Sequence, residues 1–146
     1  MSNESDVMND NLIEHLSGSH AKISFVEGKP IALVEATSSY IPIEEFKHIF
    51  SEIGKLVDSQ GISKLIFDKR KLTVFHQPSM EWYYVIWKKD MYEKGLRIHR
   101  KILPPEPWFR KSVAIAKDQI GREHNALIID KLDIKYCETV EEAIEK

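Results

Sequence analysis

A short apolar segment that ends in charged residues is the first place in the chain where chemistry is expected. Residues 62–68 read Ile-Ser-Lys-Leu-Ile-Phe-Asp, and Lys69 and Arg70 follow directly. Open α/β sheets bind ligands at the carboxyl ends of their parallel strands. We therefore expect Asp68, Arg70 and the nearby His76 to belong to a ligand site. The alternative is that Asp68 forms a local ion pair that ends the strand.

Aromatic residues gather in the segment that follows, residues 80–94, and they are Trp82, Tyr83, Tyr84, Trp87 and Tyr92. One helix face cannot bury all five of them. Trp82 and Trp87 are therefore candidates for lining a ligand groove, because Trp and Tyr supply large contact areas at low entropic cost. The same helix offers a face for a homodimer, for which we expect contacts from Met80, Tyr84, Trp87 and Met91.

Positive charge is concentrated between Lys88 and Lys117, a stretch that contains nine Lys and Arg residues and only three acidic residues. A proline-rich loop in this stretch leads into Trp108 and Arg110, so we add both to the candidate ligand-binding residues. The expected partner is a partner protein or a small anionic or amphipathic ligand. Nucleic acid ranks last among the anions, since the chain has no RNA-binding signature. The alternative is a solvated surface with its charges spread in space.

Motifs for catalysis and for metal or cofactor binding are absent from the sequence. It has no GxSxG, GxxxxGK[ST] or GxGxxG, and its six histidines include no HExxH pair. Its single cysteine, Cys137, excludes an internal disulfide and is expected in the core. We therefore expect a protein that is not an enzyme and needs no metal or cofactor. An enzyme stays as the weaker alternative, and it requires two of Asp68, His76 and His124 to converge in one cleft.

Length and composition favour a single domain: 146 residues, 42% hydrophobic and 30% charged, with a net charge of -2. Residues 1–19 hold four acidic and no basic residues, unlike a secretory signal. The longest apolar run, 83–87, is far shorter than the roughly 20 residues of a membrane span. We expect a cytoplasmic protein with a flexible acidic tail over 1–20 and a domain over 21–146.

Hydrophobic spacing and turn residues predict a single α/β domain. Its mostly parallel central sheet carries an N-terminal antiparallel hairpin, and helices pack on the sheet. The expected strands are 21–27, 30–36, 62–68, 112–116 and 134–137. The expected helices are 43–59, 80–94 and 119–132, and a capping-box pair at Thr139 and Glu142 opens a closing helix. Residues 96–103 are expected to be extended.

The ending Val140-Glu-Glu-Ala, the segment Leu65-Ile-Phe-Asp68 and the order of elements resemble the bacterial STAS-like families. These are relatives of the anti-sigma-factor antagonists, and the similarity is to the branch grouped with the lipid-binding SEC14-type fold. The resemblance implies a non-enzymatic regulatory or binding module. It also implies an alternative, a carrier of a lipid or other hydrophobic ligand in a SEC14-like pocket. A packed interior between the aromatic helix and the sheet would count against that carrier.

One signature of the antagonists is missing from this chain. Their loop after the central strand carries Asp-Ser-x-Gly, and the partner kinase phosphorylates its serine. Here His76-Gln-Pro-Ser79 stands at that place. The resemblance makes Ser79 a candidate phosphorylation site, and the alternative is that Ser79 is an ordinary helix N-cap.

Overall fold

The computed structural model describes residues 10–74, 76–124 and 128–146. A six-stranded sheet forms its centre, and its strand order follows the chain order from β1 to β6. The first three strands are antiparallel, and β3 to β6 are parallel. The strands are β1 (Leu12–Ser17), β2 (Ala21–Val26), β3 (Ile31–Ala36), β4 (Lys64–Asp68), β5 (Ile98–Ile102) and β6 (Asp133–Tyr136). The predicted α/β class, with its mostly parallel sheet and N-terminal hairpin, is confirmed.

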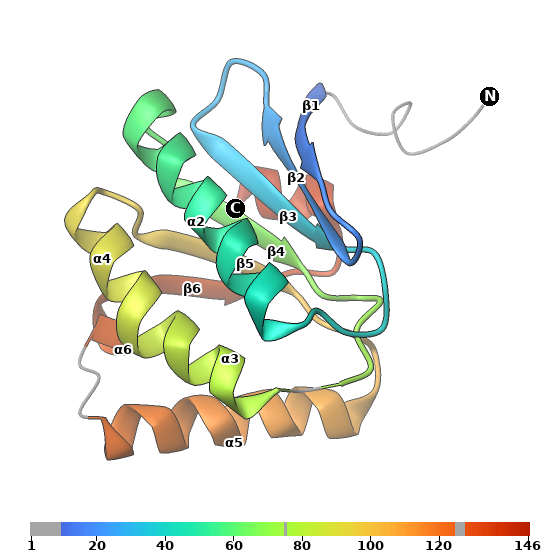
Figure 1. Ribbon diagram of the computed structural model, residues 1–146, viewed down its shortest axis with the longest axis vertical. Helices are drawn as coiled ribbons and strands as arrows, with labels where there is room; N and C mark the ends of the chain where they lie inside the picture. The colour runs from blue at the N-terminus through green and yellow to red at the C-terminus, as the bar shows by residue number, and fades with distance from the viewer. Residues whose placement is uncertain (1–9, 75, 125–127) are drawn as a thin grey trace.

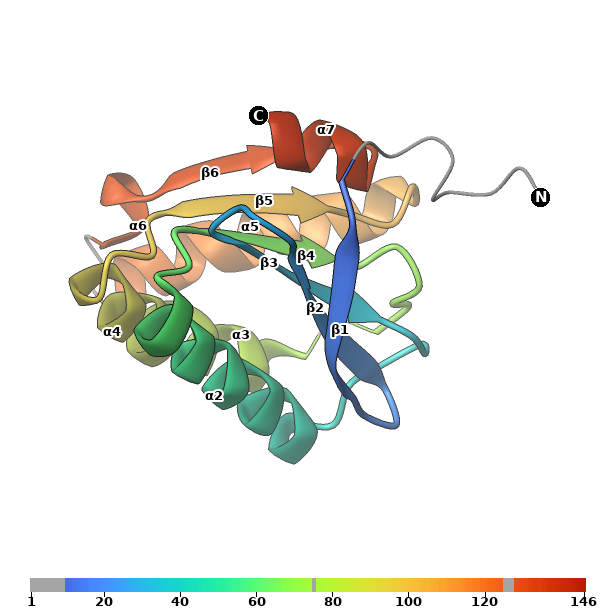
Figure 2. The ribbon, with the colours of Figure 1, turned by 90° about the horizontal axis from the view of Figure 1, so that it is seen from above.

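Helices cover the two faces of this sheet unequally. They are α2 (Ile43–Gln60), α3 (Gln77–Glu81), the π-helix η1 (Trp82–Trp87), α4 (Lys88–Glu93), α5 (Pro107–Glu123), α6 (Ile128–Lys131) and α7 (Val140–Glu145). The segments α3, η1 and α4 run on without a break and are called the α3–α4 helix below. The helices α2, α3–α4 and α5 lie on one face, called the helix face (Figure 1), and α7 lies on the other (Figure 2).

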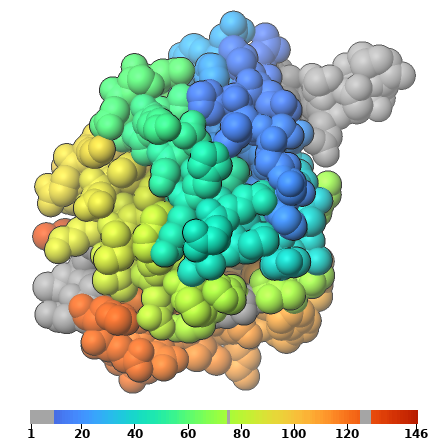
Figure 3. Space-filling model, in the orientation of Figure 1, coloured from blue at the N-terminus to red at the C-terminus, as the bar shows by residue number. Residues whose placement is uncertain are grey.

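The larger core lies between the sheet and the helix face. Helix α2 contributes Phe46, Ile49, Phe50 and Ile53 at helical spacing, and Gly61 ends it in the left-handed region with φ 64°. In space-filling view these helices lie side by side over the sheet, next to the N-terminal hairpin (Figure 3). A smaller core beneath α7 includes Ile66, Ile102 and Cys137, so the expectation that the cysteine is buried is confirmed.

The fourth predicted strand is wrong, because residues 112–116 lie inside α5. Short apolar runs are compatible with either a strand or a buried helix segment. Here Phe109, Val113, Ala116 and Ile120 are buried at helical spacing. The strand that precedes α5 is β5 (Ile98–Ile102), which lies within the segment 96–103 that we expect to be extended. The helix predicted over 119–132 is likewise replaced by the end of α5 and by α6.

At the N-terminus, the expected tail over 1–20 overlaps a strand. Strand β1 pairs antiparallel with β2, from Leu12 opposite Val26 to Ser17 opposite Lys22. Its side chains are mostly exposed, so main-chain hydrogen bonds to β2 hold it in the sheet. The sequence therefore shows no apolar pattern from which this strand could be predicted. The part of the expected tail over 1–9 lies outside the described residues.

The closing helix α7 begins as predicted. The Thr139 hydroxyl accepts a hydrogen bond from the Glu142 N–H at 3.1 Å, and the Glu142 carboxylate accepts one from the Glu138 N–H at 2.7 Å. This reciprocal pair satisfies two main-chain donors at the helix start. It positions α7 over β4 and β5, on the side of the sheet away from the other helices (Figure 2).

Candidate functional site

A cavity of about 150 Å³ lies where β4 ends, between the start of α2, the start of α3 and α5. Its described polar lining consists of Tyr40, Lys69, His76 and Ser79. The rest of the described lining is apolar: Ile41, Pro42, Ile43, Phe46, Phe67, Leu72, Val74, Met80 and Phe109. Tyr40 and Val74 are exposed, so the cavity is open to solvent on their side. This is an apolar site with few polar groups, as ligand pockets commonly are.

Lys69 supplies the only ammonium group among the described residues of this lining. Its N–H donates to the Ile102 carbonyl at 2.8 Å and continues the pairing of β4 with β5 for one residue beyond Asp68. Successive side chains of a strand point to opposite faces, so Lys69 turns to the helix face, as Phe67 does. Its Nζ lies 4.8 Å from the centroid of the Phe67 ring. The residue is only 2% exposed, and burial lowers the pKa of its ammonium group to about 8.

Two further lysines, Lys88 at the start of α4 and Lys101 on β5, are fully buried on the same face. The Nζ atoms of both lie 4.5 Å from the centroid of the Tyr84 ring. The centroid of the Tyr83 ring lies 4.6 Å from Lys88 Nζ and 5.6 Å from Lys101 Nζ. Ammonium groups are attracted to aromatic ring faces. The two tyrosines therefore hold both amines in one place, and the Lys101 amine also hydrogen-bonds the Tyr84 hydroxyl.

The π-helix η1 is what turns Lys88 toward the sheet. The Lys88 N–H donates to the carbonyl of Tyr83, five residues earlier, instead of four as in an α-helix. The wider turn carries an additional residue, so that Tyr83 and Tyr84, and then Trp87 and Lys88, are all buried as adjacent pairs. Wide turns of this kind recur at functional sites.

Lys69, Lys88 and Lys101, called the lysine cluster below, have no acidic partner in the part of the chain that the structure describes. Among the residues that the structure describes, no carboxylate lies within 4.0 Å of the amine of Lys69, Lys88 or Lys101. Lys88 Nζ is buried and has no hydrogen-bond partner among the described residues. Burial lowers the pKa of Lys88 and of Lys101 well below the ordinary value, and their mutual repulsion lowers the pKa of Lys101 further.

His99 completes the buried basic region from β5. Both of its ring nitrogens are buried and find no hydrogen-bond partner within the described ranges. Burial and the nearby Lys88 hold the pKa of His99 well below its ordinary value, which keeps the ring neutral at pH 7. A neutral ring adds no charge of its own to this region.

His76 and Ser79, both candidates from the sequence, meet at the cavity. His76 is the N-cap of α3, and its Nδ1 accepts a hydrogen bond from the Ser79 N–H at 3.3 Å. The Ser79 hydroxyl lies 2.8 Å from the same nitrogen. The N-cap expected at Ser79 is therefore wrong by three residues, because the histidine ring does the capping. Ser79 is nearly buried, which leaves its hydroxyl facing the cavity lining and not bulk solvent.

Asp68 and Arg70, by contrast, form an ion pair away from the cavity. Arg70 donates to the two Asp68 carboxylate oxygens from Nε at 3.0 Å and from Nη2 at 2.7 Å. Neither residue is part of the cavity lining described above. Strand alternation places Asp68 on the α7 face with Lys64 and Ile66. This geometry agrees with the alternative of a local ion pair at the end of the strand.

The tryptophans of the α3–α4 helix lie outside the cavity lining. Trp87 is buried and donates from Nε1 to the Phe50 carbonyl at 2.8 Å, while Trp82 is half-buried against Phe46. The homodimer contacts expected from Met80, Tyr84, Trp87 and Met91 are wrong. All four side chains are buried in the chain's own core, because the π-helix widens the inward face.

Trp108 and Arg110, the remaining candidates, lie apart from the lysine cluster. Trp108 is 53% exposed on α5. Arg110 donates to the Pro104 carbonyl at 3.0 Å and borders a second cavity of about 290 Å³ with Tyr136, Cys137 and Glu138. The basic stretch is not a uniformly solvated surface, since Lys88 and Lys101 are buried in it.

The three residues considered for an acid–base pair lie in three different surroundings. Asp68 pairs with Arg70 on the α7 face, and His76 lies at the cavity. His124 follows the end of α5 and lies 3.7 Å from the carboxylate of Glu81. The described residues thus bring His76 together with Ser79 and Lys69 in one lining, and not with Asp68 or His124.

The lysine cluster is what the sequence reasoning missed. One available signal was the strand period of two, which places Lys69, and not Asp68, on the same face as Leu65 and Phe67. A comparable alternation pairs His99 with Lys101. For Lys88 the sequence offers no such signal, because its inward direction depends on the π-helix.

No group of three or more His, Cys, Asp or Glu side chains lies within metal-binding reach of one another in the described ranges. No helix in the part of the chain that the structure describes is both long and apolar enough to cross a bilayer. Comparison of the chain with models of known protein families, with curated proteins and with solved structures finds no match.

Proposed function

We propose that this chain is a binding module for a small amphipathic anion, a carboxylate carried on an apolar ring or short chain. The observation that supports it is the Lys69 ammonium group in an apolar cavity, with no carboxylate partner among the described residues. A buried cation without a partner is costly to the folded protein. An anionic ligand would supply the missing charge, and the apolar lining would bury its body.

The size of the cavity limits the ligand. A cavity of about 150 Å³ is comparable to an engineered cavity known to hold benzene. A benzoate ion therefore combines a suitable ring with the proposed charge, and it is the probe of choice. Benzyl alcohol has the same ring without the charge and is its control ligand.

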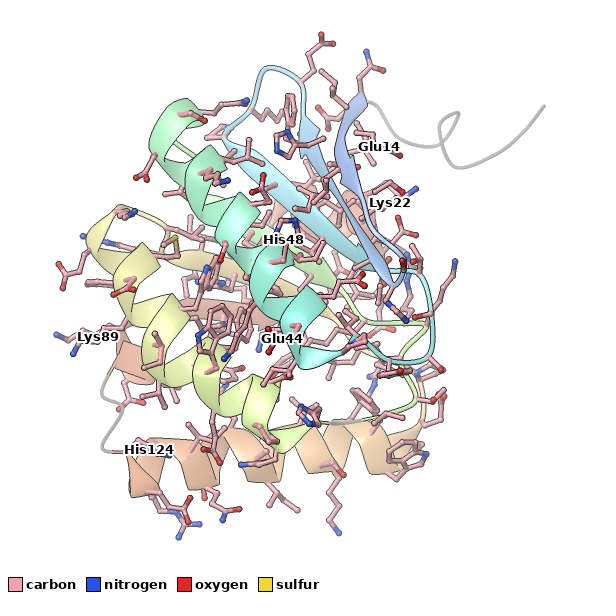
Figure 4. The ribbon with its side chains drawn as sticks, viewed as in Figure 1. Glu14, Lys22, Glu44, His48, Lys89 and His124 are labelled. Carbon is pink, nitrogen blue, oxygen red and sulfur yellow. The ribbon has the colours of Figure 1, made fainter. Side chains whose placement is uncertain are left out.

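The test measures benzoate binding by isothermal titration calorimetry at pH 7 in the wild-type chain and in Lys69→Met. We expect Lys69→Met to bind about 10-fold to 100-fold more weakly, since a hydrogen bond to a charged group contributes about 1.5–3 kcal/mol. Lys89→Met is the matched control, because Lys89 lies next to Lys88 but projects outward from α4 (Figure 4). Equal benzoate affinity in wild type and Lys69→Met would refute the proposal.

A carrier of uncharged hydrophobic ligands is the second candidate, and the apolar lining of the cavity favours it. It predicts that benzyl alcohol binds at least as well as benzoate and that Lys69→Met improves its binding. The space between the α3–α4 helix and the sheet is filled by Tyr83, Tyr84 and Trp87. A cavity at the strand ends, sized for a ring, therefore suits a small molecule better than a lipid with long acyl chains.

A further inference from the structure

The Lys69 amine differs from the other buried lysines in facing a cavity that opens to solvent. Lys88 and Lys101 are fully buried and are not part of the described cavity lining. A small molecule that enters beside Tyr40 and Val74 therefore meets one amine, that of Lys69. We infer that Lys69 is a nucleophile that condenses with an aldehyde or ketone held in this cavity to form an imine. The inference rests on the proposed function only in sharing its cavity.

The surroundings of Lys69 favour an uncharged, reactive amine. In the apolar lining, Phe46, Phe67 and Phe109 replace the water that stabilises an ammonium ion. This burial is what lowers the pKa of Lys69. Lysine amines in apolar pockets are among those that proteins use as nucleophiles.

The lowered pKa of Lys69 greatly increases the fraction of its amine that is neutral, compared with an ordinary lysine. Only the neutral amine has a free electron pair for attack on a carbonyl carbon. With a pKa of about 8 instead of 10.5, the neutral fraction at pH 7 is about 300-fold greater than for an ordinary lysine. Among the described residues, the titratable groups that line the cavity with Lys69 are Tyr40 and His76. Behind the cavity, Lys88 on the α3–α4 helix and Lys101 on β5 interact electrostatically with Lys69.

The reaction is balanced without a further reagent. The Lys69 nitrogen forms a bond to the carbonyl carbon, and the carbonyl oxygen takes up a proton to give a carbinolamine. The carbon–oxygen bond then breaks, and the two amine hydrogens leave with the oxygen as one water molecule. His76 and Ser79 line the same cavity and offer an imidazole and a hydroxyl to carry these protons.

The test uses benzaldehyde, which has the ring of the benzoate probe. The intact wild-type chain is incubated with benzaldehyde and sodium cyanoborohydride, which reduces an imine to a stable benzylamine. Intact mass and peptide mapping then count and locate the adducts. We expect one dominant adduct on Lys69, with an initial rate that rises with pH around a midpoint near pH 8. Labelling of Lys69 no faster than that of the exposed Lys89 would overturn the inference.

Two further measurements separate this inference from the proposed anion site. Benzoate added to the wild-type chain should protect Lys69 from benzaldehyde, which requires no variant to fold. Lys69→Arg keeps a positive charge but loses the reactive amine, so we expect it to bind benzoate and to form no adduct in the cavity. Benzoate binding with no Lys69 adduct overturns the imine and leaves the anion site standing. A Lys69 adduct without benzoate binding or protection supports the imine and overturns the anion site.

Discussion

The two faces of the sheet both bury charged side chains, but they treat them differently. On the α7 face, Lys64, Asp68 and Arg100 each have partners of the opposite charge or polarity. On the helix face, the lysine cluster has aromatic rings and one tyrosine hydroxyl around it, and no carboxylate among the described residues. The same strands, β4 and β5, supply residues to both faces.

The α7 face shows how a buried charge is satisfied when it serves the fold. Lys64 Nζ donates to the carbonyls of Ala143 and Ile144 at 3.1 and 2.8 Å, near the end of α7. Arg100 donates to the Asp133 carboxylate and to the Lys146 carbonyl. A cation near a helix C-terminus also interacts favourably with the helix dipole. These charges attach α7 to the sheet.

On the helix face, the lysine cluster has no carboxylate partner among the described residues, and one of its members, Lys69, lines a cavity. Strongly perturbed pKa values that arise from burial next to a cavity are typical of binding and catalytic sites. Structural charges on the opposite side of the same strands show that the fold provides partners for buried cations elsewhere. The proposed anionic ligand would therefore supply a partner to Lys69, the member of the cluster that lines the cavity.

The largest expected effect is on stability when the unpartnered lysine is removed. Lys88→Met keeps the length of the side chain without its amine, so we expect the free energy of unfolding to rise by about 3 kcal/mol at pH 7. Urea unfolding followed by tryptophan fluorescence measures it. The exposed Lys89→Met should change stability by no more than about 0.5 kcal/mol. A loss of stability in Lys88→Met would remove the contrast between the two faces.

The second effect is a dependence of the free energy of unfolding on pH, caused by the titration of Lys69. The unfolded chain keeps this lysine protonated up to pH 10.5, while the folded chain releases the proton near pH 8 because burial lowers the pKa. The unfolded state then binds more protons, so stability rises with pH. Between pH 7.5 and 9.5 we expect wild type to gain about 2 kcal/mol relative to Lys69→Met. Urea unfolding of both proteins at each pH measures this gain, and parallel pH profiles would contradict it.

On the α7 face, the corresponding substitution should have the opposite sign. Lys64→Met leaves two main-chain carbonyls without their donor, which costs about 1–3 kcal/mol per buried group left unsatisfied. Ala143 and Ile144 lie in the last turn of α7, and helix ends fray, so we expect a loss of about 1.5 kcal/mol. Thermal unfolding of Lys64→Met beside Lys88→Met checks the sign. A stabilised Lys64→Met would show that both faces bury lysines at a cost.

Much of the fold could be predicted because local signals and packing agree. The apolar spacing of α2 and the capping pair of Thr139 and Glu142 each indicate an element that the structure contains. Strand β5 was harder, because His99, Arg100 and Lys101 occupy its centre and its sequence does not look like a buried strand. Main-chain pairing with β4 and β6 forms that strand, and such pairing leaves no mark on the pattern of side chains.

The sequence points to the carboxyl end of β4, and the candidate cavity lies there with Lys69 in its lining in place of Asp68. Asp68 marks the strand end, and the next residue, Lys69, turns into the cavity. The choice between them depends on which face of the sheet the helices cover, and that is a property of the whole topology. Trp87 looked free for a ligand because a regular helix would have room for fewer inward residues than η1 buries.

The smallest effect tests the two tyrosines that hold the lysine cluster. The Tyr84 hydroxyl bonds the Lys101 amine, whereas the Tyr83 hydroxyl is buried and has no partner within the described residues. Tyr84→Phe should therefore lower the free energy of unfolding by about 1 kcal/mol. Tyr83→Phe removes an unsatisfied hydroxyl and keeps the ring, so its stability should be unchanged or slightly raised.

The two variants serve as controls for each other in one urea titration, because the rings are adjacent and both buried. Equal losses in both would mean that the hydroxyl of Tyr83 has a partner after all, for example a bound water between it and Lys88. The helix face would then satisfy its polar groups as the α7 face does, and the case for an anionic ligand would rest on the cavity alone.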